Sequence, residues 1–309
     1  MKKSFLLIGM VLTVNQVLAQ EPEIYSGPII DMHLHAYTNL DFWGPAPNPS
    51  TGEMSVNNHR GHYDQCIAML KKHNVVLAMV DCEYRTALGP WVDTLGDDVV
   101  IKGFRKDYED INRFRNWVSE GEIELFGEVD PIYVGHSPDD SVFFPYYEIC
   151  EQYDIPVGIH TGGSFPGITD SNKNFRLRLG DPFLVEDILV SYPNLRIYLM
   201  HAGAHFYERT AMLMLQYPNL YVDIAVLNWV PDAKNFLSPF LKLAKNYKVL
   251  DRVMYGSDQM VWPEAIEMAI ENIQSLDFLT LEEKKGIFYD NAARFLKLSE
   301  EEIARHHIN

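Results

Sequence analysis

Residues 29–35 read Ile-Ile-Asp-Met-His-Leu-His, a short apolar run that closes on two histidines. The run has the length and the β-branched content of a buried strand. An open doubly wound sheet usually carries a glycine-rich phosphate turn after its first strand, and no such turn follows here. The stretch therefore favours a closed barrel of parallel strands over an open sheet.

The same kind of run recurs along the chain, separated by segments with the apolar spacing of helices. Strands that are apolar on both faces are typical of sheets covered by helices. Seven further runs follow the first, at residues 75–81, 99–105, 123–130, 155–160, 195–201, 220–226 and 253–258. A total of about eight predicts an α/β fold, a (β/α)8 TIM barrel. No low-complexity linker divides the chain, so we expect a single domain over residues 20–309.

The composition excludes several classes of function. The chain has 309 residues, 47% of them hydrophobic, with 26 Lys and Arg against 43 Asp and Glu. The net charge of −17 argues against sequence-independent binding to nucleic acid or to an anionic membrane. Three cysteines without CxxC spacing indicate neither a disulfide framework nor a thiolate zinc site. A metal site in this chain would need histidine and carboxylate ligands.

Residues 1–19 have the pattern of a secretory signal peptide. Lys2 and Lys3 precede an apolar run at residues 5–14, and Ala19 ends a short segment that a signal peptidase accepts. The alternative is a membrane anchor, but the run is shorter than the roughly 20 residues that span a bilayer. We therefore expect cleavage after Ala19, a periplasmic or secreted protein, and no stable membrane insertion of the mature chain.

The positions of the histidines indicate a metal site. His33 and His35 point to the same side of a strand, because side chains two residues apart share a face. Four more residues with ligand-capable side chains each lie at or near the end of a different predicted strand: Glu128, His160, His201 and Asp258. The carboxyl ends of barrel strands meet at one mouth, where active sites are built. The sequence therefore predicts a divalent-metal site at that mouth.

The loops after the strands supply candidates for substrate binding. Residues 36–58 are rich in Gly and Pro and predict a long irregular loop, either a pocket wall or a solvated excursion. Arg105 could pair with a substrate carboxylate or form a salt bridge at the rim. Tyr84, Arg176 and Trp262 could line the pocket or pack on the surface. Asp223 is interpreted as structural, paired with a neighbouring barrel residue.

Taken in order, the motifs resemble those of the amidohydrolase superfamily, in the amidohydrolase-2 branch that includes aminocarboxymuconate-semialdehyde decarboxylase-like enzymes. The resemblance covers nearly the whole mature chain. It is carried by the motifs at residues 31–35 (Asp-Met-His-Leu-His), 156–161 (Pro-Val-Gly-Ile-His-Thr), 200–203 (Met-His-Ala-Gly), 255–258 (Tyr-Gly-Ser-Asp) and 291–296 (Asn-Ala-Ala-Arg-Phe-Leu).

The resemblance implies that His33, His35 and His160 bind a divalent cation, with Asp258 as a further ligand or a partner of the bound water. It implies that His201 is either a ligand of a second metal or an acid/base. Two-metal members of the superfamily often use a carboxylated lysine on the fourth strand, and no lysine ends that strand here. Glu128 could bridge two ions instead, or hold a histidine N–H. We expect Zn²⁺, with Mn or Fe as alternatives, as one ion or two.

These residues predict an exported metal-dependent hydrolase that uses a metal-activated water on an amide, ester or lactone of a small molecule, with Asp258 and His201 as catalytic residues. The alternative is a non-oxidative decarboxylase or hydratase of an unsaturated or aromatic carboxylic acid. Some aromatic-acid decarboxylases of the branch carry a glutamate soon after the sixth-strand histidine, where this chain has Ala-Gly-Ala-His at residues 202–205. A third hypothesis is a metal-stabilised binding protein that has lost catalysis. A homodimer is compatible with such a barrel.

Overall fold

The structure is a computed structural model that describes residues 22–105, 109–232 and 234–308. The predicted signal peptide, residues 1–19, lies outside the described residues. Within the described part of the chain, no helix combines the length and the apolar character needed to span a membrane.

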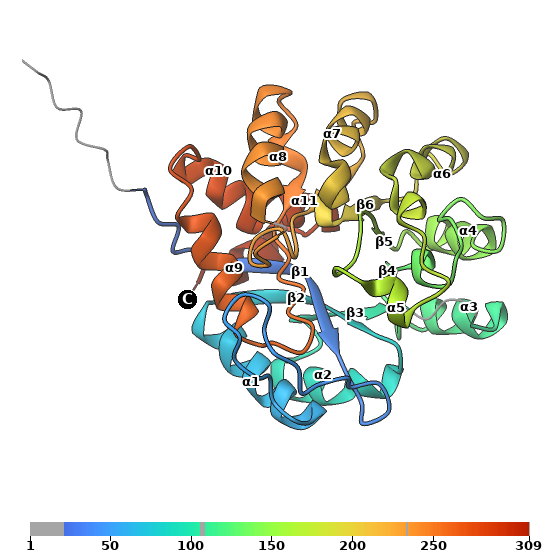
Figure 1. Cartoon of the computed structure of the whole chain (residues 1–309), viewed down its shortest axis with the longest axis horizontal. Helices are drawn as coiled ribbons and strands as arrows, with labels where there is room; N and C mark the ends of the chain where they lie inside the picture. The colour runs from blue at the N-terminus through green and yellow to red at the C-terminus, as the bar shows by residue number, and fades with distance from the viewer. Residues whose placement is uncertain (1–21, 106–108, 233, 309) are drawn as a thin grey trace, which may run out of the picture.

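Eight parallel strands follow one another in chain order around a single sheet, with helices outside them (Figure 1). The strands are β1 (Ile29–Ala36), β2 (Val75–Cys82), β3 (Val100–Phe104), β4 (Leu125–Val129), β5 (Val157–His160), β6 (Ile197–Met200), β7 (Tyr221–Asp223) and β8 (Val253–Met254). This order confirms the predicted (β/α)8 barrel and its single domain.

The eighth strand is much shorter than the predicted run at residues 253–258. The chain leaves the ladder after Met254, and two backbone hydrogen bonds then join it to β1 and complete the ring. The N–H of Met32 donates to the carbonyl of Tyr255 at 3.0 Å, and the N–H of Asp258 donates to the carbonyl of His33 at 2.8 Å. Asp258 therefore lies on a loop that β1 holds in place, and not at a strand end.

The helices lie outside the strands and cover the barrel (Figure 1). They are α1 (His59–Lys72), α2 (Gly89–Leu95), α3 (Ile111–Ser119), α4 (Phe144–Gln152), α6 (Glu186–Ser191), α7 (Tyr207–Gln216), α8 (Lys234–Asn246), α9 (Ala265–Gln274), α10 (Leu281–Lys285), α11 (Asn291–Leu296) and α12 (Glu300–His306), with a one-turn α5 (Ile168–Ser171) in the connection after β5. Side-chain caps mark several helix starts. Asn58, for example, accepts from the Gly61 N–H at the start of α1.

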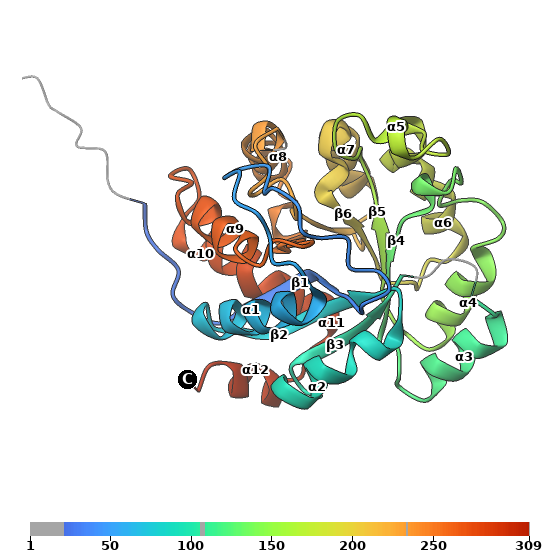
Figure 2. The same ribbon diagram turned by 60° about the horizontal axis from the view of Figure 1, so that its bottom comes forward.

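The core has two parts. One lies inside the barrel and is built by inward-facing residues such as Ile30, Met79, Tyr198 and Met254. The other lies between the outer strand faces and the helices. Ile303 of α12 packs against the inner cluster, and Figure 2 shows this last helix on the same side of the barrel as α2. The inner residues fill the barrel below the mouth, so polar residues above them are held over a packed apolar floor.

Hydrogen bonds connect the loop at residues 37–58 to the barrel mouth. Trp262 donates through Nε1 to the carbonyl of Ala46 at 2.9 Å, and Asn48 donates to Glu264 at 2.8 Å. The Ser50 hydroxyl donates to the carbonyl of Trp229 at 2.6 Å. These contacts tie the loop to the connections that follow β7 and β8, so it forms part of the rim and is not a free excursion.

Candidate metal centre

A β-bulge in β1 turns both of its histidines inward. Asp31 pairs with Ala78 of β2, but Leu34 pairs with Val80, so β1 has one residue more than its partner over this stretch. Met32 belongs to the inner cluster, and Leu34 to the outer one. The extra residue therefore places His33 on the inner side next to Met32, and regular alternation adds His35.

A second bulge, in β4, turns Glu128 inward. Phe126 pairs with Val157 of β5, and Val129 pairs with Ile159, which again gives the bulged strand one extra residue. Phe126 and Val129 both pack in the outer core. Without the bulge, Glu128 would share the outward side of Phe126, because side chains two residues apart lie on one face. The bulge instead brings its carboxylate to the barrel axis, where it is 7% exposed.

His160 ends β5 in regular alternation, whereas His201 reaches the centre by a change of backbone direction. His201 follows β6 directly and has φ of +62°, in the left-handed region that non-glycine residues rarely adopt. Its N–H donates to Oδ1 of Asp223 at 2.7 Å. Both histidines are buried, at 6% and 5% exposure.

The two oxygens of Glu128 face two different pairs of imidazoles. Oε2 lies 3.6 Å from Nε2 of His33 and 3.9 Å from Nε2 of His35. Oε1 lies 2.6 Å from Nδ1 of His160 and 2.9 Å from Nε2 of His201. We call His33, His35 and Asp258 the first half-site, and His160 and His201 the second half-site. Glu128 lies between them, and each histidine pair forms a group with Glu128 whose ligand atoms lie within 4.8 Å of one another.

In all four histidines, the ring nitrogen that points away from Glu128 contacts an acceptor. A carbonyl cannot donate, and a carboxylate accepts when ionised, so these contacts hold a proton on the outer nitrogen, and a cation can take the place of any proton on the inner one. The outer contacts are His33 Nδ1 with Asp223 (3.0 Å), His35 Nδ1 with Asp81 (2.9 Å), His160 Nε2 with the Gly163 carbonyl (3.1 Å) and His201 Nδ1 with the Ala225 carbonyl (3.3 Å).

This arrangement fits a divalent cation. Nε2 of His33 is buried and has no hydrogen-bond partner among the described residues, although a carboxylate oxygen lies 3.6 Å away. Inner imidazole nitrogens and a carboxylate converge on the same space, which is the donor set that Zn, Mn and Fe take in proteins. The predicted ligands His33, His35, Glu128, His160 and His201 are therefore brought together.

Asp258 completes the first half-site. Its Oδ1 lies 2.8 Å from Nε2 of His35, and its Oδ2 lies 4.0 Å from Nδ1 of His201. Burial alone would raise the pKa of Asp258, but the imidazoles of His33, His35 and His201 hold it below its ordinary value. The carboxylate is therefore ionised at neutral pH and can bind a cation or accept a proton.

Glu128 is held in its ionised form in the same way. Burial raises its pKa, but His33, His160 and His201 lower it well below the ordinary value. The effect on the histidines is reciprocal. Burial lowers the pKa of His33, whereas Asp258, Asp223 and Glu128 raise it by more. Without a cation, protons on the imidazoles thus balance the buried carboxylates.

The predicted substrate-binding residues lie in different environments. Arg105 follows β3, and its Nη1 lies 3.3 Å from Oδ2 of Asp81 and 3.2 Å from Nδ1 of His35, so it borders the first half-site. Trp262 is 7% exposed and packs between Trp43 and Trp229 while it holds the loop at residues 37–58.

Tyr84 and Arg176 lie in the connections that follow β2 and β5. Tyr84 is half-buried in the connection that follows β2. Arg176 is exposed, and its guanidinium donates to the carbonyls of Lys173 and Phe175 in its own loop. Among the contacts described for these four residues, those of Arg105 reach a proposed metal ligand.

Three residues around the cluster were not predicted as part of the site. Asp81 and Asp223 orient His35 and His33 through their outer nitrogens. The ring of Tyr133 lies edge-on to His160, with centroids 5.3 Å apart. Asp81 ends a predicted strand, as the proposed ligands do, and this position could have identified it as a site residue from the sequence. Asp223 is paired with a barrel residue, as predicted, but that residue is a proposed metal ligand.

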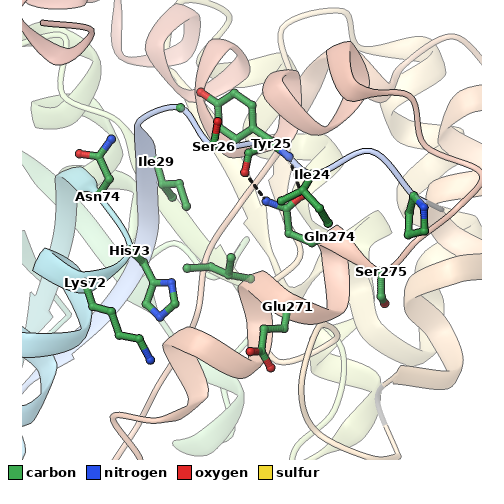
Figure 3. A pocket seen from close by; sticks show the side chains of 13 residues that line it. Ile24, Tyr25, Ser26, Ile29, Lys72, His73, Asn74, Glu271, Gln274 and Ser275 are labelled. Carbon is green, nitrogen blue, oxygen red and sulfur yellow. Dashed lines mark hydrogen bonds between the residues drawn. The ribbon is translucent and has the colours of Figure 1, made fainter. Parts of the chain in front are cut away.

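A cavity of about 580 Å³ lies away from these residues (Figure 3). It is lined by Ile29 at the start of β1 and by Lys72, His73 and Glu271. Gln274 and Tyr25 close one side of it with two hydrogen bonds between the glutamine amide and the tyrosine backbone. Because β1 and β2 begin here, the cavity lies at the end of the barrel opposite the cluster, and it contains none of the candidate ligands.

Comparison with protein families gives one match. A family model described as Amidohydrolase (Amidohydro_2) matches residues 127–298, a span that includes Glu128, His160, His201 and Asp258. No curated protein matches the chain.

Solved structures share the fold at low sequence identity. An uncharacterised TIM-barrel protein from Bordetella bronchiseptica is 16% identical with a TM-score of 0.64, covering 87% of this chain and 98% of that one. A probable 2-pyrone-4,6-dicarboxylic acid hydrolase from Acinetobacter baumannii is 13% identical with a TM-score of 0.62, covering 87% and 99%. The 5-carboxyvanillate decarboxylase of Novosphingobium aromaticivorans, complexed with manganese, is 16% identical with a TM-score of 0.59, covering 90% and 99%.

Proposed function

Because the chain belongs to the amidohydrolase family, in its amidohydrolase-2 branch, we propose that it is a metal-dependent hydrolase with two divalent cations. Its substrate would be a small molecule with an ester, lactone or amide bond. The nitrogen and oxygen donors favour Zn²⁺, with Mn and Fe as alternatives.

One observation carries this proposal. Each oxygen of Glu128 faces its own pair of imidazoles, at 3.6 and 3.9 Å on one side and at 2.6 and 2.9 Å on the other. Glu128, with one histidine pair at each oxygen, would hold two cations, and a pair of cations would supply an activated water for displacement. His201 is then a ligand of the second cation, in preference to an acid/base beside a single one.

The surrounding residues provide the rest of the reaction. When bound, the cations would lower the pKa of a water towards about 7 and would polarise a substrate oxygen. Asp258 is ionised and buried at 4% exposure, so it can accept the proton of the attacking water and return it to the leaving group. Asp81 and Asp223 keep the ring orientations of His35 and His33 fixed throughout. Arg105, at the edge of the first half-site, is positioned to meet a negatively charged substrate group.

Non-oxidative decarboxylation of a carboxylic acid is the second candidate. It is favoured by the structural neighbour named as a 5-carboxyvanillate decarboxylase and complexed with manganese. Arg105 could hold a carboxylate in that reaction too, so the first half-site suits either chemistry. The second half-site favours hydrolysis over decarboxylation, because a cation held there would be available to activate a water.

A substrate panel tests the proposed reaction. The Zn²⁺-loaded protein is assayed on esters, lactones and amides for hydrolysis, and on aromatic and unsaturated carboxylic acids for carbon dioxide release. We expect hydrolysis, and we expect Asp258→Asn to lower its rate by about 10²- to 10⁴-fold, as removal of a general base does. The matched control is Asp93→Asn, an exposed carboxylate on α2 that should leave the rate unchanged. Carbon dioxide release without hydrolysis would overturn the hydrolase proposal in favour of the decarboxylase.

We also propose that the protein acts outside the cytoplasm. The support is the signal-peptide pattern of residues 1–19. N-terminal sequencing of the exported protein should find Gln20 first.

A further inference from the structure

Asp223, the last residue of β7, has a fully buried carboxylate that contacts both half-sites. Its Oδ2 lies 3.0 Å from Nδ1 of His33. Its Oδ1 accepts from the backbone N–H of His201 at 2.7 Å and of Ala225 at 3.1 Å. Both oxygens are therefore engaged, and they reach histidines that lie on opposite sides of Glu128.

We propose that Asp223 is a positioning residue that aligns His33 and His201 for the two cations at once. The inference rests on the proposed metal centre. Through Oδ2, Asp223 keeps a proton on Nδ1 of His33, so that Nε2 presents its lone pair to the space beside Glu128. Through Oδ1, it fixes the left-handed backbone of His201, which directs Nε2 of that ring to Oε1 of Glu128.

Asp81 offers a comparison, because it orients His35 with one oxygen only. Its Oδ2 lies 2.9 Å from Nδ1 of His35 and 3.3 Å from Nη1 of Arg105. Its Oδ1 is buried and has no hydrogen-bond partner within the part of the chain that the structure describes. An amide at position 81 can therefore turn its oxygen toward His35 and lose no other hydrogen bond.

An amide at position 223 has no such freedom. If its oxygen stays with the N–H groups of His201 and Ala225, its NH₂ faces Nδ1 of His33 and drives the ring proton to Nε2, which blocks the ligand nitrogen. If the amide turns over, its NH₂ group faces the backbone N–H groups of His201 and Ala225, and neither of these N–H groups then has an acceptor. Asp223→Asn and Asp81→Asn make the same chemical change, but the change at Asp223 should disturb its ligand histidines much more than the change at Asp81 disturbs His35.

The test is Zn²⁺ affinity, measured by competition with a chromophoric chelator, for wild type, Asp223→Asn and Asp81→Asn. We expect Asp223→Asn to weaken binding by about 10- to 100-fold, the usual effect of losing the partner of a ligating histidine. The loss of Zn²⁺ affinity in Asp81→Asn should be at least tenfold smaller than the loss in Asp223→Asn. Nitrogen NMR of histidine-labelled, Zn²⁺-loaded protein should show one fewer imidazole with a protonated Nδ1 and a Zn²⁺-bound Nε2 in Asp223→Asn.

The melting temperatures of the metal-free proteins separate positioning from folding. Similar values for the two variants, together with the affinity difference, would support the proposal. Equal Zn²⁺ affinities for the two variants would overturn the proposal. A loss of affinity in Asp223→Asn that comes with a lower melting temperature and an unchanged imidazole spectrum would also overturn it. A wild-type protein without Zn²⁺ affinity would overturn the proposed function, and the positioning role with it.

Discussion

Single residues decide whether the histidines can reach the centre, and Gly256 is one example. A Cβ on Gly256 would lie 2.8 Å from Cβ of His33, closer than such atoms pack, and 3.2 Å from Cβ of Ala225. The motif at residues 255–258 was identified from its final aspartate, but its glycine has a separate task. It lets the loop that carries Asp258 pass directly against the strand that carries His33.

We predict that a side chain at position 256 weakens metal binding. Gly256→Ala should displace His33 and weaken Zn²⁺ binding by about tenfold or more, as other disturbances of ligand orientation do. Gly89→Ala is the matched control, because Gly89 starts α2 and a Cβ there meets no atom within 4 Å. Titration of both variants with Zn²⁺ would check this. Unaltered affinity in Gly256→Ala would show that the loop and β1 can separate without cost to the site.

At the scale of elements, alternation predicted the shared face of His33 and His35 correctly, but it could not predict how Glu128 reaches them. The bulges in β1 and β4 each insert one residue, and each lies where a proposed ligand must turn inward. A bulge depends on the register of two strands far apart in the sequence, so the pattern of one strand does not reveal it. The early end of β8 also depends on contacts between distant parts of the chain. The residues that follow β8 form backbone hydrogen bonds with β1, and the sequence of β8 alone does not reveal them.

Helix α1 carries a titratable group that should make stability depend on pH. His62 is 1% exposed, donates from Nε2 to the carbonyl of Met260 at 2.7 Å and lies beside Cys66. Burial lowers its pKa from 6.5 to about 4. Between these two values the unfolded chain binds the proton and the folded chain does not, so stability falls as the pH drops from 6.5 to 4.

The expected contribution of His62 over that range is about 3 kcal/mol, from the size of the pKa shift. His62→Gln keeps a side-chain N–H donor but removes the titration. Urea unfolding at pH 7 and pH 4.5 should therefore show a smaller pH-dependent loss of stability in the variant than in wild type. Equal losses in the two proteins would mean that His62 is protonated in the folded state.

For the whole molecule, the strand count and the absence of a glycine-rich turn after the first strand were enough to predict the barrel, since the number and order of buried runs determine it. The convergence of His33, His35, His160, His201 and Asp258 followed from the same topology. The sequence could not predict the division into half-sites, because it depends on which ring nitrogen faces Glu128. The partners that decide this, among them Asp223 and the Gly163 carbonyl, come from other parts of the chain.

The central claim is that Glu128 bridges two cations. The measurement that tests it most directly is elemental analysis of Zn²⁺-loaded protein, purified without chelator or affinity metal, for wild type and Glu128→Gln. The account predicts about two equivalents in wild type and about one in the variant, held by His33, His35 and Asp258. One equivalent in both proteins would contradict the bridge, and no bound metal in either would contradict the metal centre itself.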